Sequence, residues 1–257
     1  MADQPTLDIT KDGSSSLYSH EVGQLYHSRG GAITESKYVY FELSGLEEAL
    51  RKDEPITVLE VGFGTGLNIM IALHYYQKHN CSNPLHFYSI EASPITSQVF
   101  EQLNYAELLG NPLLKTLLLP IFSNLKSGLN TFKLLPDKPI YLHLFIGTFD
   151  QFVQDDLKVD FIMHDAFSPE VNGELWTPEV FSKLNRISSN NGVLTTYCSA
   201  SKARAAMAVA DWKIARTPGV LGKREMTMAS LNEQKLSQYK RVDEKKLAER
   251  YLDGAFD

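Results

Sequence analysis

Residues 58–68, with the sequence VLEVGFGTGLN, constrain the fold of this chain more than any other segment. A short apolar run carries the acid Glu60, glycines follow at 62, 64 and 66, and a helical pattern begins directly after them. Glycine permits positive φ and lets the backbone come close to a ligand. The N-terminus of the following helix directs unpaired N–H groups toward the loop. The segment therefore predicts a strand, a ligand-binding loop and a helix.

The spacing of the three glycines separates this loop from two common nucleotide-binding loops. G-x-G-x-G differs from the G-x-G-x-x-G of dinucleotide folds and from the G-x-x-x-x-G-K-[ST] of phosphate loops, in which a lysine binds phosphate. It is typical of class I S-adenosylmethionine methyltransferases, whose cofactor has no phosphate at that place. The alternative is that the glycine loop is a purely structural turn. The remaining sequence has to decide between the two interpretations.

Length and composition indicate an ordinary globular protein. A chain of 257 residues suits one α/β domain with additions. No apolar run is long enough to span a membrane, and the polar amino terminus lacks a signal-peptide core, so we expect no membrane partner. Cys81 and Cys198 lack metal-type spacing. We therefore predict no metal, and two buried free thiols in a reducing, cytoplasmic environment.

Net charge limits the kind of nucleic-acid contact that is possible. The formal charge is −6, which counts against a broad basic surface but permits a local one. Basic residues gather late in the chain, between Lys202 and Lys246. The simplest interpretation of such scattered cations is a solvated surface.

Strands alternate with helices along the chain. We expect strands at 56–60, 85–90, 141–146, 159–163 and 193–197, and helices at 67–78, 178–188 and 202–210. This order predicts a Rossmann-like α/β fold, with a mostly parallel sheet and helices on both faces. Ligands in such sheets bind beyond the carboxyl ends of the strands. Those ends carry Glu60, Glu91, Gly147 and Asp165.

We divide the chain into three parts. Residues 1–54 form a β-rich or irregular extension, which includes a β-type run at 37–41. Residues 55–232 form the Rossmann-like methyltransferase domain. Residues 233–257 form a charged helical tail.

Two acids are candidates for holding a nucleoside cofactor. Glu91 ends the second strand, about 30 residues beyond the glycine loop, where an acid can accept both ribose hydroxyls. The alternative is an ordinary charged strand end. Glu60 either contacts the methionine end of the cofactor, directly or through water, or holds the loop by accepting backbone N–H groups.

Asp165 is the candidate catalytic residue. It follows the apolar run 159–163 directly, and an acid in that position is costly unless it is paired or used. A primary amine is mostly protonated at neutral pH, and only the neutral amine has a lone pair. A carboxylate can orient the amine and help to remove a proton, and positioning then supplies much of the catalysis of an in-line methyl transfer. Asp165 capping the next turn is the alternative, and we interpret His164 as a packing residue.

Aromatic residues near the predicted loops are candidates for stacking on a nucleobase. The candidates are Tyr26, Tyr38, Tyr40 and Phe167, but aromatics in a β-rich segment more often belong to the core. We keep Tyr26 and Phe167. Trp176 is interpreted as core packing or as part of a lid.

Together these residues resemble the methyltransferase domain of the tRNA 5-methylaminomethyl-2-thiouridine biosynthesis protein, MnmC. The Asp-x-Phe-x-Pro sequence at 165–169 also resembles the (Asp/Asn)-Pro-Pro-(Tyr/Phe) loop of amine and base N-methyltransferases. The stretches that carry the resemblance to MnmC lie at 25–28, 35–39, 60–68, 89–94, 165–177 and 222–226. The glycine loop marks only the superfamily. The aspartate loop followed by Trp-Thr and the late Gly-Lys-Arg-Glu-Met are narrower features.

The resemblance implies transfer of a methyl group from S-adenosylmethionine to the aminomethyl group of a tRNA wobble uridine. The product would be 5-methylaminomethyl(-2-thio)uridine. It further implies that tRNA is the partner. Because the oxidase domain of the two-domain relatives is not expected here, a separate enzyme is a candidate supplier of the aminomethyl precursor. The residues assigned to the cofactor are Glu60, Gly62, Gly64, Gly66, Asn68, Glu91, Thr148 and Asp165. Those assigned to the substrate are Tyr26, Phe167, Lys223 and Arg224, the last two as phosphate contacts.

The chain departs from the family pattern in three ways. Thr148 stands where relatives often have an acid, with Asp150 two residues later, and this leaves the adenine contact open. Val171 stands where relatives can have lysine. A second, FAD-dependent oxidase domain has no room here, so the chain is expected to be a free-standing methyltransferase.

Two other functions remain open. An aminopropyltransferase of the spermidine-synthase type shares the glycine loop and the aspartate loop, but it usually has a second acid where this chain has Ser168. The second alternative is a catalytically silent family member that binds tRNA or a protein. The intact set of loop glycines with Glu91 and Asp165 argues against it.

Overall fold

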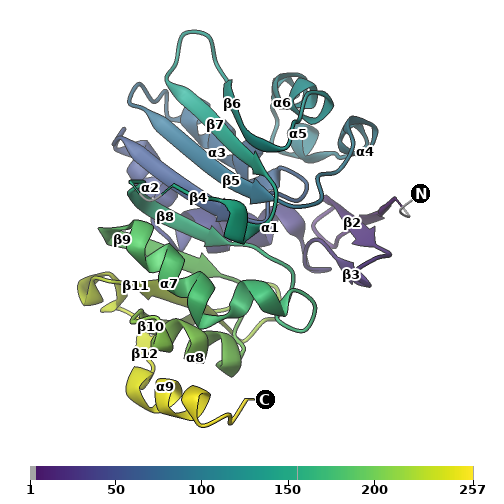
Figure 1. Ribbon diagram of the computed structural model, residues 1–257. Helices are drawn as coiled ribbons and strands as arrows, with labels where there is room; N and C mark the ends of the chain where they lie inside the picture. Colours follow the sequence, from purple (N-terminus) through teal and green to yellow (C-terminus); the bar gives the residue numbers. More distant parts are fainter. Residues whose placement is uncertain (1–3, 155, 257) are drawn as a thin grey trace.

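A nine-stranded sheet organises the protein (Figure 1). The computed structural model describes residues 4–154 and 156–256. Strand order is β12-β10-β11-β9-β8-β4-β5-β7-β6. The central strands β4, β5, β7, β8 and β9 are parallel, and the strands beyond them are antiparallel. Their bounds are β4 Ile56–Val61, β5 Leu85–Glu91, β6 Gly128–Lys133, β7 Ile140–Ile146, β8 Val159–His164, β9 Ser188–Thr196, β10 Lys213–Pro218, β11 Glu225–Ser230 and β12 Lys240–Arg241. The predicted α/β class with a mostly parallel sheet is confirmed.

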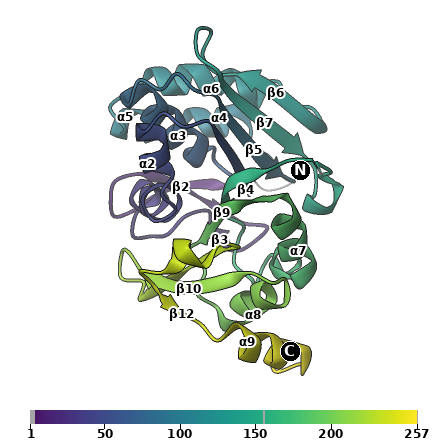
Figure 2. The ribbon, with the colours of Figure 1, turned by 90° about the vertical axis from the view of Figure 1, so that its left-hand side faces the viewer.

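Helices lie on both sides of this sheet (Figure 2). One side carries α3 (Leu67–Lys78), α4 (Ser97–Glu101), α5 (Tyr105–Leu108) and α6 (Leu113–Ser123). The other side carries α7 (Pro178–Ile187), α8 (Ser201–Val209) and α9 (Glu244–Leu252). On this second side, Figure 1 shows the described helices over the β8–β9–β11–β10 half, and the face of β5, β7 and β6 is left without one.

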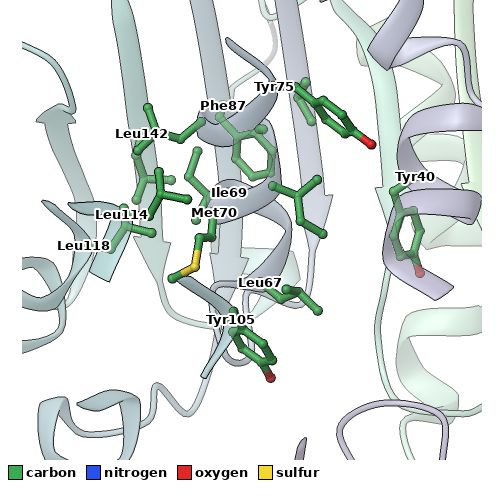
Figure 3. Packing of buried hydrophobic residues seen from close by; sticks show 14 of the residues in the cluster. Tyr40, Leu67, Ile69, Met70, Tyr75, Phe87, Tyr105, Leu114, Leu118 and Leu142 are labelled. Carbon is green, nitrogen blue, oxygen red and sulfur yellow. The ribbon is translucent and has the colours of Figure 1, made fainter. Parts of the chain in front are cut away.

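Helix α3 follows the glycine loop directly, and its apolar residues bury it in the core. Gly66 precedes the helix in the left-handed conformation, and nine of the twelve residues of α3 are buried. Figure 3 shows Ile69 between Leu114 of α6 and Phe87 of β5. Each such side chain contributes about 1.5–3 kcal/mol on burial. This packing fixes the start of α3, and with it the glycine loop, against the end of β4.

The amino-terminal part is partly helical, which corrects one expectation. Strands β1 (Thr6–Ile9), β2 (Ser15–Ser19) and β3 (Gln24–Leu25) form a small antiparallel sheet. Helix α1 (Ala32–Ser36), the π-helical turn η1 (Lys37–Glu42) and α2 (Leu46–Arg51) follow. The β-type interpretation of residues 37–41 is therefore wrong. Val39, Tyr40 and Phe41 are all buried, and packing of a helical turn against the main core outweighs their β-propensity.

The carboxyl-terminal part also contributes to the sheet. β12 pairs with β10, and α9 packs on α8, so the expected helical tail includes one short strand. None of the described helices is long and apolar enough to cross a membrane. Cys81 and Cys198 are both buried free thiols, as predicted.

Candidate active site

A cavity of about 700 Å³ opens at the carboxyl ends of the parallel strands. Its walls come from the glycine loop, from the ends of β5, β7 and β8, and from the amino-terminal segment 19–40. Nine predicted site residues line it: Tyr26, Gly62, Gly64, Asn68, Glu91, Thr148, Asp165, Phe167 and Lys223. Glu60, Gly66 and Arg224 are not among the residues that line it. The cavity therefore lies at the sheet edge that the sequence predicts to bind a ligand.

The glycine loop is packed so tightly that side chains are excluded. Gly62 has φ +97°, and a Cβ there would lie 2.7 Å from the carbonyl oxygen of Asp165. A Cβ at Gly64 would meet the ring of Tyr26 at 3.3 Å. Gly66 instead faces two phenylalanine rings of the core. The loop therefore runs backbone to backbone beside Asp165, and its open side faces the cavity.

Glu91 is held by the backbone at the end of β5. Its Oε2 accepts the N–H of Gly64 at 2.8 Å, and its Oε1 accepts the N–H of Ser93 at 2.7 Å. Burial raises the pKa of Glu91, and these two hydrogen bonds oppose the rise. A carboxylate has about four lone-pair sites, so it can still accept a ligand hydroxyl beside these backbone bonds. This arrangement suits a carboxylate that binds a diol.

Glu60 lies behind the cavity wall. Its side chain is 1% exposed. One oxygen accepts from Asn68 Nδ2 at 2.9 Å and the other from Ser89 Oγ at 2.5 Å. Burial raises the pKa of Glu60 well above its ordinary value. In this geometry Glu60 reaches the cavity through Asn68, and it does not hold the loop through backbone N–H groups.

Asp165 lies at the end of β8 with both carboxylate oxygens engaged. Oδ1 accepts from the hydroxyl of Tyr40 at 2.6 Å, and Oδ2 accepts from Asn68 Nδ2 at 2.9 Å. Burial raises the pKa of Asp165 to about 7, although both hydrogen bonds act to lower it. The carboxylate is oriented by these side chains of distant elements. With a pKa near neutrality it can accept a proton and release it again.

Tyr26 and Phe167 form an aromatic wall of the cavity. Their rings meet edge to face, with centroids 5.1 Å apart. Burial raises the pKa of the Tyr26 hydroxyl to about 12, so it stays protonated. Beside them, Gln24 Nε2 donates to Ser168 Oγ at 3.0 Å. The amino-terminal sheet is thereby attached to the aspartate loop.

Thr148, Lys223 and Arg224 occupy different parts of the site. Thr148 is exposed at the rim, and its N–H donates to Gln151 Oε1 at 3.0 Å. Lys223 points inward, with Nζ 2.5 Å from Glu35 Oε1. Arg224 is exposed to solvent. Of the two predicted phosphate contacts, only Arg224 therefore presents its charge to the outside in this structure.

Several cavity residues were missed by sequence reasoning. Tyr40 was weighed and set aside as core, yet its hydroxyl reaches Asp165. Glu35 and Tyr197 also line the cavity and were not considered. The place of Glu35 in the stretch 35–39, which carries the family resemblance, was the available indication for it. Nothing local marks Tyr197, which reaches the site because β9 ends beside β8.

Two interpretations outside the cavity can be checked. His164 packs against Trp176 with ring centroids 4.3 Å apart, and its Nε2 lies 2.9 Å from the Leu175 carbonyl, which confirms a packing role. Arg204 is 3% exposed and paired with Glu225 at 2.7 Å, so this member of the late basic group is structural. Among the described residues, no group of three or more His, Cys, Asp or Glu side chains could hold a metal.

Comparison with known proteins identifies the class of cofactor. Residues 113–232 match the model of a family described as S-adenosyl-L-methionine-dependent methyltransferase. The chain has the fold of MnmC2 from Aquifex aeolicus, with a TM-score of 0.72 and 23% identity over 96% of this chain and 81% of that one. The cofactor of this family is thus S-adenosylmethionine.

Curated relatives match over most of this chain. The tRNA 5-methylaminomethyl-2-thiouridine biosynthesis bifunctional protein MnmC of Cupriavidus metallidurans is 30% identical over 86% of this chain and 33% of its own length. The protein of the same name from Leptospira interrogans is 30% identical over 84% of this chain and 34% of its own. The chain therefore spans about a third of the length of these relatives.

Proposed function

We propose that this chain, an S-adenosylmethionine-dependent methyltransferase by fold and family match, methylates the aminomethyl group of a wobble uridine in tRNA. The product is 5-methylaminomethyl-uridine or its 2-thio form. One observation carries the proposal. Asp165, with its pKa near 7, lies in the cavity beside the glycine loop, where its carboxylate is able to accept a proton from a substrate amine. The names of the curated relatives support the choice of tRNA.

The residues present fit the cofactor. Gly62 lets the loop lie against the Asp165 backbone, where a Cβ would clash, and its backbone and the Glu91 carboxylate line the same cavity. These two would hold the nucleoside part, with Gly64 and Asn68 beside them. S-adenosylmethionine, when bound, supplies an electrophilic methyl group.

The protein's own contribution is to prepare the amine. A substrate ammonium enters the cavity and donates a hydrogen bond to Asp165. Transfer of one proton from nitrogen to this carboxylate leaves a neutral amine with a free lone pair. Tyr40 and Asn68 keep the carboxylate in place during the transfer. Tyr26 and Phe167 shield the site from water and offer an aromatic surface to the base.

Other features complete the proposal. Arg224, exposed beside the cavity residue Lys223, contacts tRNA phosphate. A separate enzyme supplies the aminomethyl precursor, and the protein acts in the cytoplasm, in keeping with two free thiols. Residues 55–232 form the methyltransferase domain, between the extension 1–54 and the tail 233–257.

Nucleoside mass spectrometry of tRNA from a deletion strain tests the function. The unmethylated 5-aminomethyl nucleoside should accumulate, and the gene should restore the methylated form. A gene encoding Asp165→Asn should fail to restore it, whereas the purified variant should still bind S-adenosylmethionine in calorimetry. A normal nucleoside profile with altered polyamines would instead indicate the aminopropyl transfer. Purified protein that binds no S-adenosylmethionine would indicate a silent member.

A further inference from the structure

A lysine ammonium occupies the cavity at a place built for a cation. Lys223 Nζ lies 2.5 Å from Glu35 Oε1 and 4.6 Å from the centroid of the Tyr197 ring. A carboxylate on one side and an aromatic face on the other are the chemistry that binds alkylammonium groups. All three residues line the cavity. Glu35 is only 7% exposed, so its charge is directed at the cavity and not at bulk water.

This cation place adjoins the catalytic carboxylate. The hydroxyl of Tyr197 donates to the carbonyl of Ala166 at 2.9 Å, so the ring is fixed to the residue after Asp165. Glu35 acts to raise the pKa of Asp165 and Lys223 acts to lower it, which means that both charges are felt at that carboxylate. An ammonium beside Glu35 is therefore also an ammonium near Asp165.

The position of Lys223 is compatible with its displacement from the cavity. Its side chain is one-third exposed. It lies on the loop between β10 and β11, directly after Gly222, which has φ +85°. The terminal CH₂–NH₃⁺ of lysine is the same group as a protonated aminomethyl substituent. Exchange of one for the other keeps the charge of the cavity constant.

We propose that Glu35 and the ring face of Tyr197 form the subsite for the substrate's ammonium group, and that Lys223 fills it until the substrate displaces it. The inference rests on the proposed function and names the residues that recognise its acceptor. Glu35 then holds the ammonium while Asp165 takes the proton. The displaced Lys223 is free to meet a phosphate of the RNA. A small acceptor without phosphates has to compete with Lys223 and gains nothing from its release.

Steady-state methyl transfer to two acceptors tests this. One acceptor is tRNA that carries 5-aminomethyl-2-thiouridine, and the other is free 5-aminomethyluridine. Glu35→Gln should raise KM for both acceptors at least tenfold and leave the Kd of S-adenosylmethionine within twofold. Lys223→Met should lower KM for the nucleoside at least threefold and raise KM for the tRNA. The matched control is Lys213→Met, a lysine outside the cavity that pairs with Glu233, and it should behave as wild type.

The outcomes separate the alternatives. An unchanged KM in Glu35→Gln overturns the subsite, and an unchanged or raised nucleoside KM in Lys223→Met overturns the displacement. The double variant Glu35→Gln/Lys223→Met removes both charges, so its KM should stay raised. Recovery of the wild-type KM in the double variant would show that Glu35 and Lys223 form only a structural ion pair, and it would refute the inference. If wild-type protein binds S-adenosylmethionine but methylates neither acceptor, the proposed function is refuted together with this inference.

Discussion

The hydroxyl of Tyr40 should set the pH at which the enzyme works. It donates to Asp165 Oδ1 at 2.6 Å, and this hydrogen bond favours the ionised carboxylate. Tyr40→Phe removes the donor and leaves the ring. A hydrogen bond to a charged group is worth about 1.5–3 kcal/mol, and 1.36 kcal/mol corresponds to one pKa unit, so the pKa of Asp165 should rise by about 1–2 units.

The consequence is a displaced acid limb of the pH profile. From its present value of about 7, the pKa would reach about 8–9. The ionised fraction at pH 7 falls from about one half to between about one tenth and one hundredth, and kcat/KM falls about 5- to 50-fold. Activity should return as the pH is raised through the new pKa.

The assay is kcat/KM for methyl transfer from pH 6 to 10, with about one-unit steps. The matched control is Tyr76→Phe, which deletes a tyrosine hydroxyl that donates to the Asn83 carbonyl outside the cavity. This control should keep the wild-type profile. An acid limb in Tyr40→Phe that coincides with that of wild type would refute a role of this hydrogen bond in the ionisation of Asp165.

Three further predictions concern the loop and the core. Gly62→Ala should weaken S-adenosylmethionine binding more than tenfold in calorimetry, because its Cβ meets backbone at 2.7 Å. The control Gly110→Ala, with φ +69° in open space, should cost only about 1 kcal/mol of stability and leave cofactor binding unchanged. Equal effects of the two variants on cofactor binding would contradict the steric argument. Arg204→Met should lower the free energy of unfolding by about 2 kcal/mol in urea, because it removes the N–H donors from the buried Thr227 hydroxyl and Met226 carbonyl, and the cofactor Kd should not change. Burial lowers the pKa of His164 from 6.5 to about 4, so the unfolded chain binds its proton first as the pH falls. Relative to His164→Phe, wild type should therefore lose up to about 3 kcal/mol between pH 7 and pH 4, and a constant difference would exclude this titration.

Much of the fold could be predicted because its determinants are local. Helix α3 spans 67–78 as expected, since the glycine loop marks its start and a continuous apolar pattern follows. The strands β4, β5 and β8 were placed to within about one residue by short apolar runs that end in polar residues. Residues 37–41 failed because their β-branched and aromatic side chains are equally suited to a buried helical turn, and only the packing of the whole chain selects it.

Site residues marked by a local pattern could also be predicted, whereas those brought together by distant contacts could not. Glu91 and Asp165 were found because each follows a strand of the parallel sheet, and strand ends meet at one edge. Tyr40 was not, because it stands 125 residues before Asp165 and reaches it from a different element. Glu35 and Lys223 come together across an even longer separation in sequence. Pairing of this kind is a property of the assembled structure and leaves no mark on the local sequence.

The cavity is lined both by the end of the parallel sheet and by the segment before β4. Gly62 and Glu91, which we propose for the methyl donor, come from the parallel sheet, whereas Glu35 and Tyr40, which we propose to act beside Asp165 on the acceptor, come from the segment before β4. A chimaera that carries another methyltransferase's leading segment in front of β4 would thus keep its affinity for the methyl donor and change its choice of nucleophile.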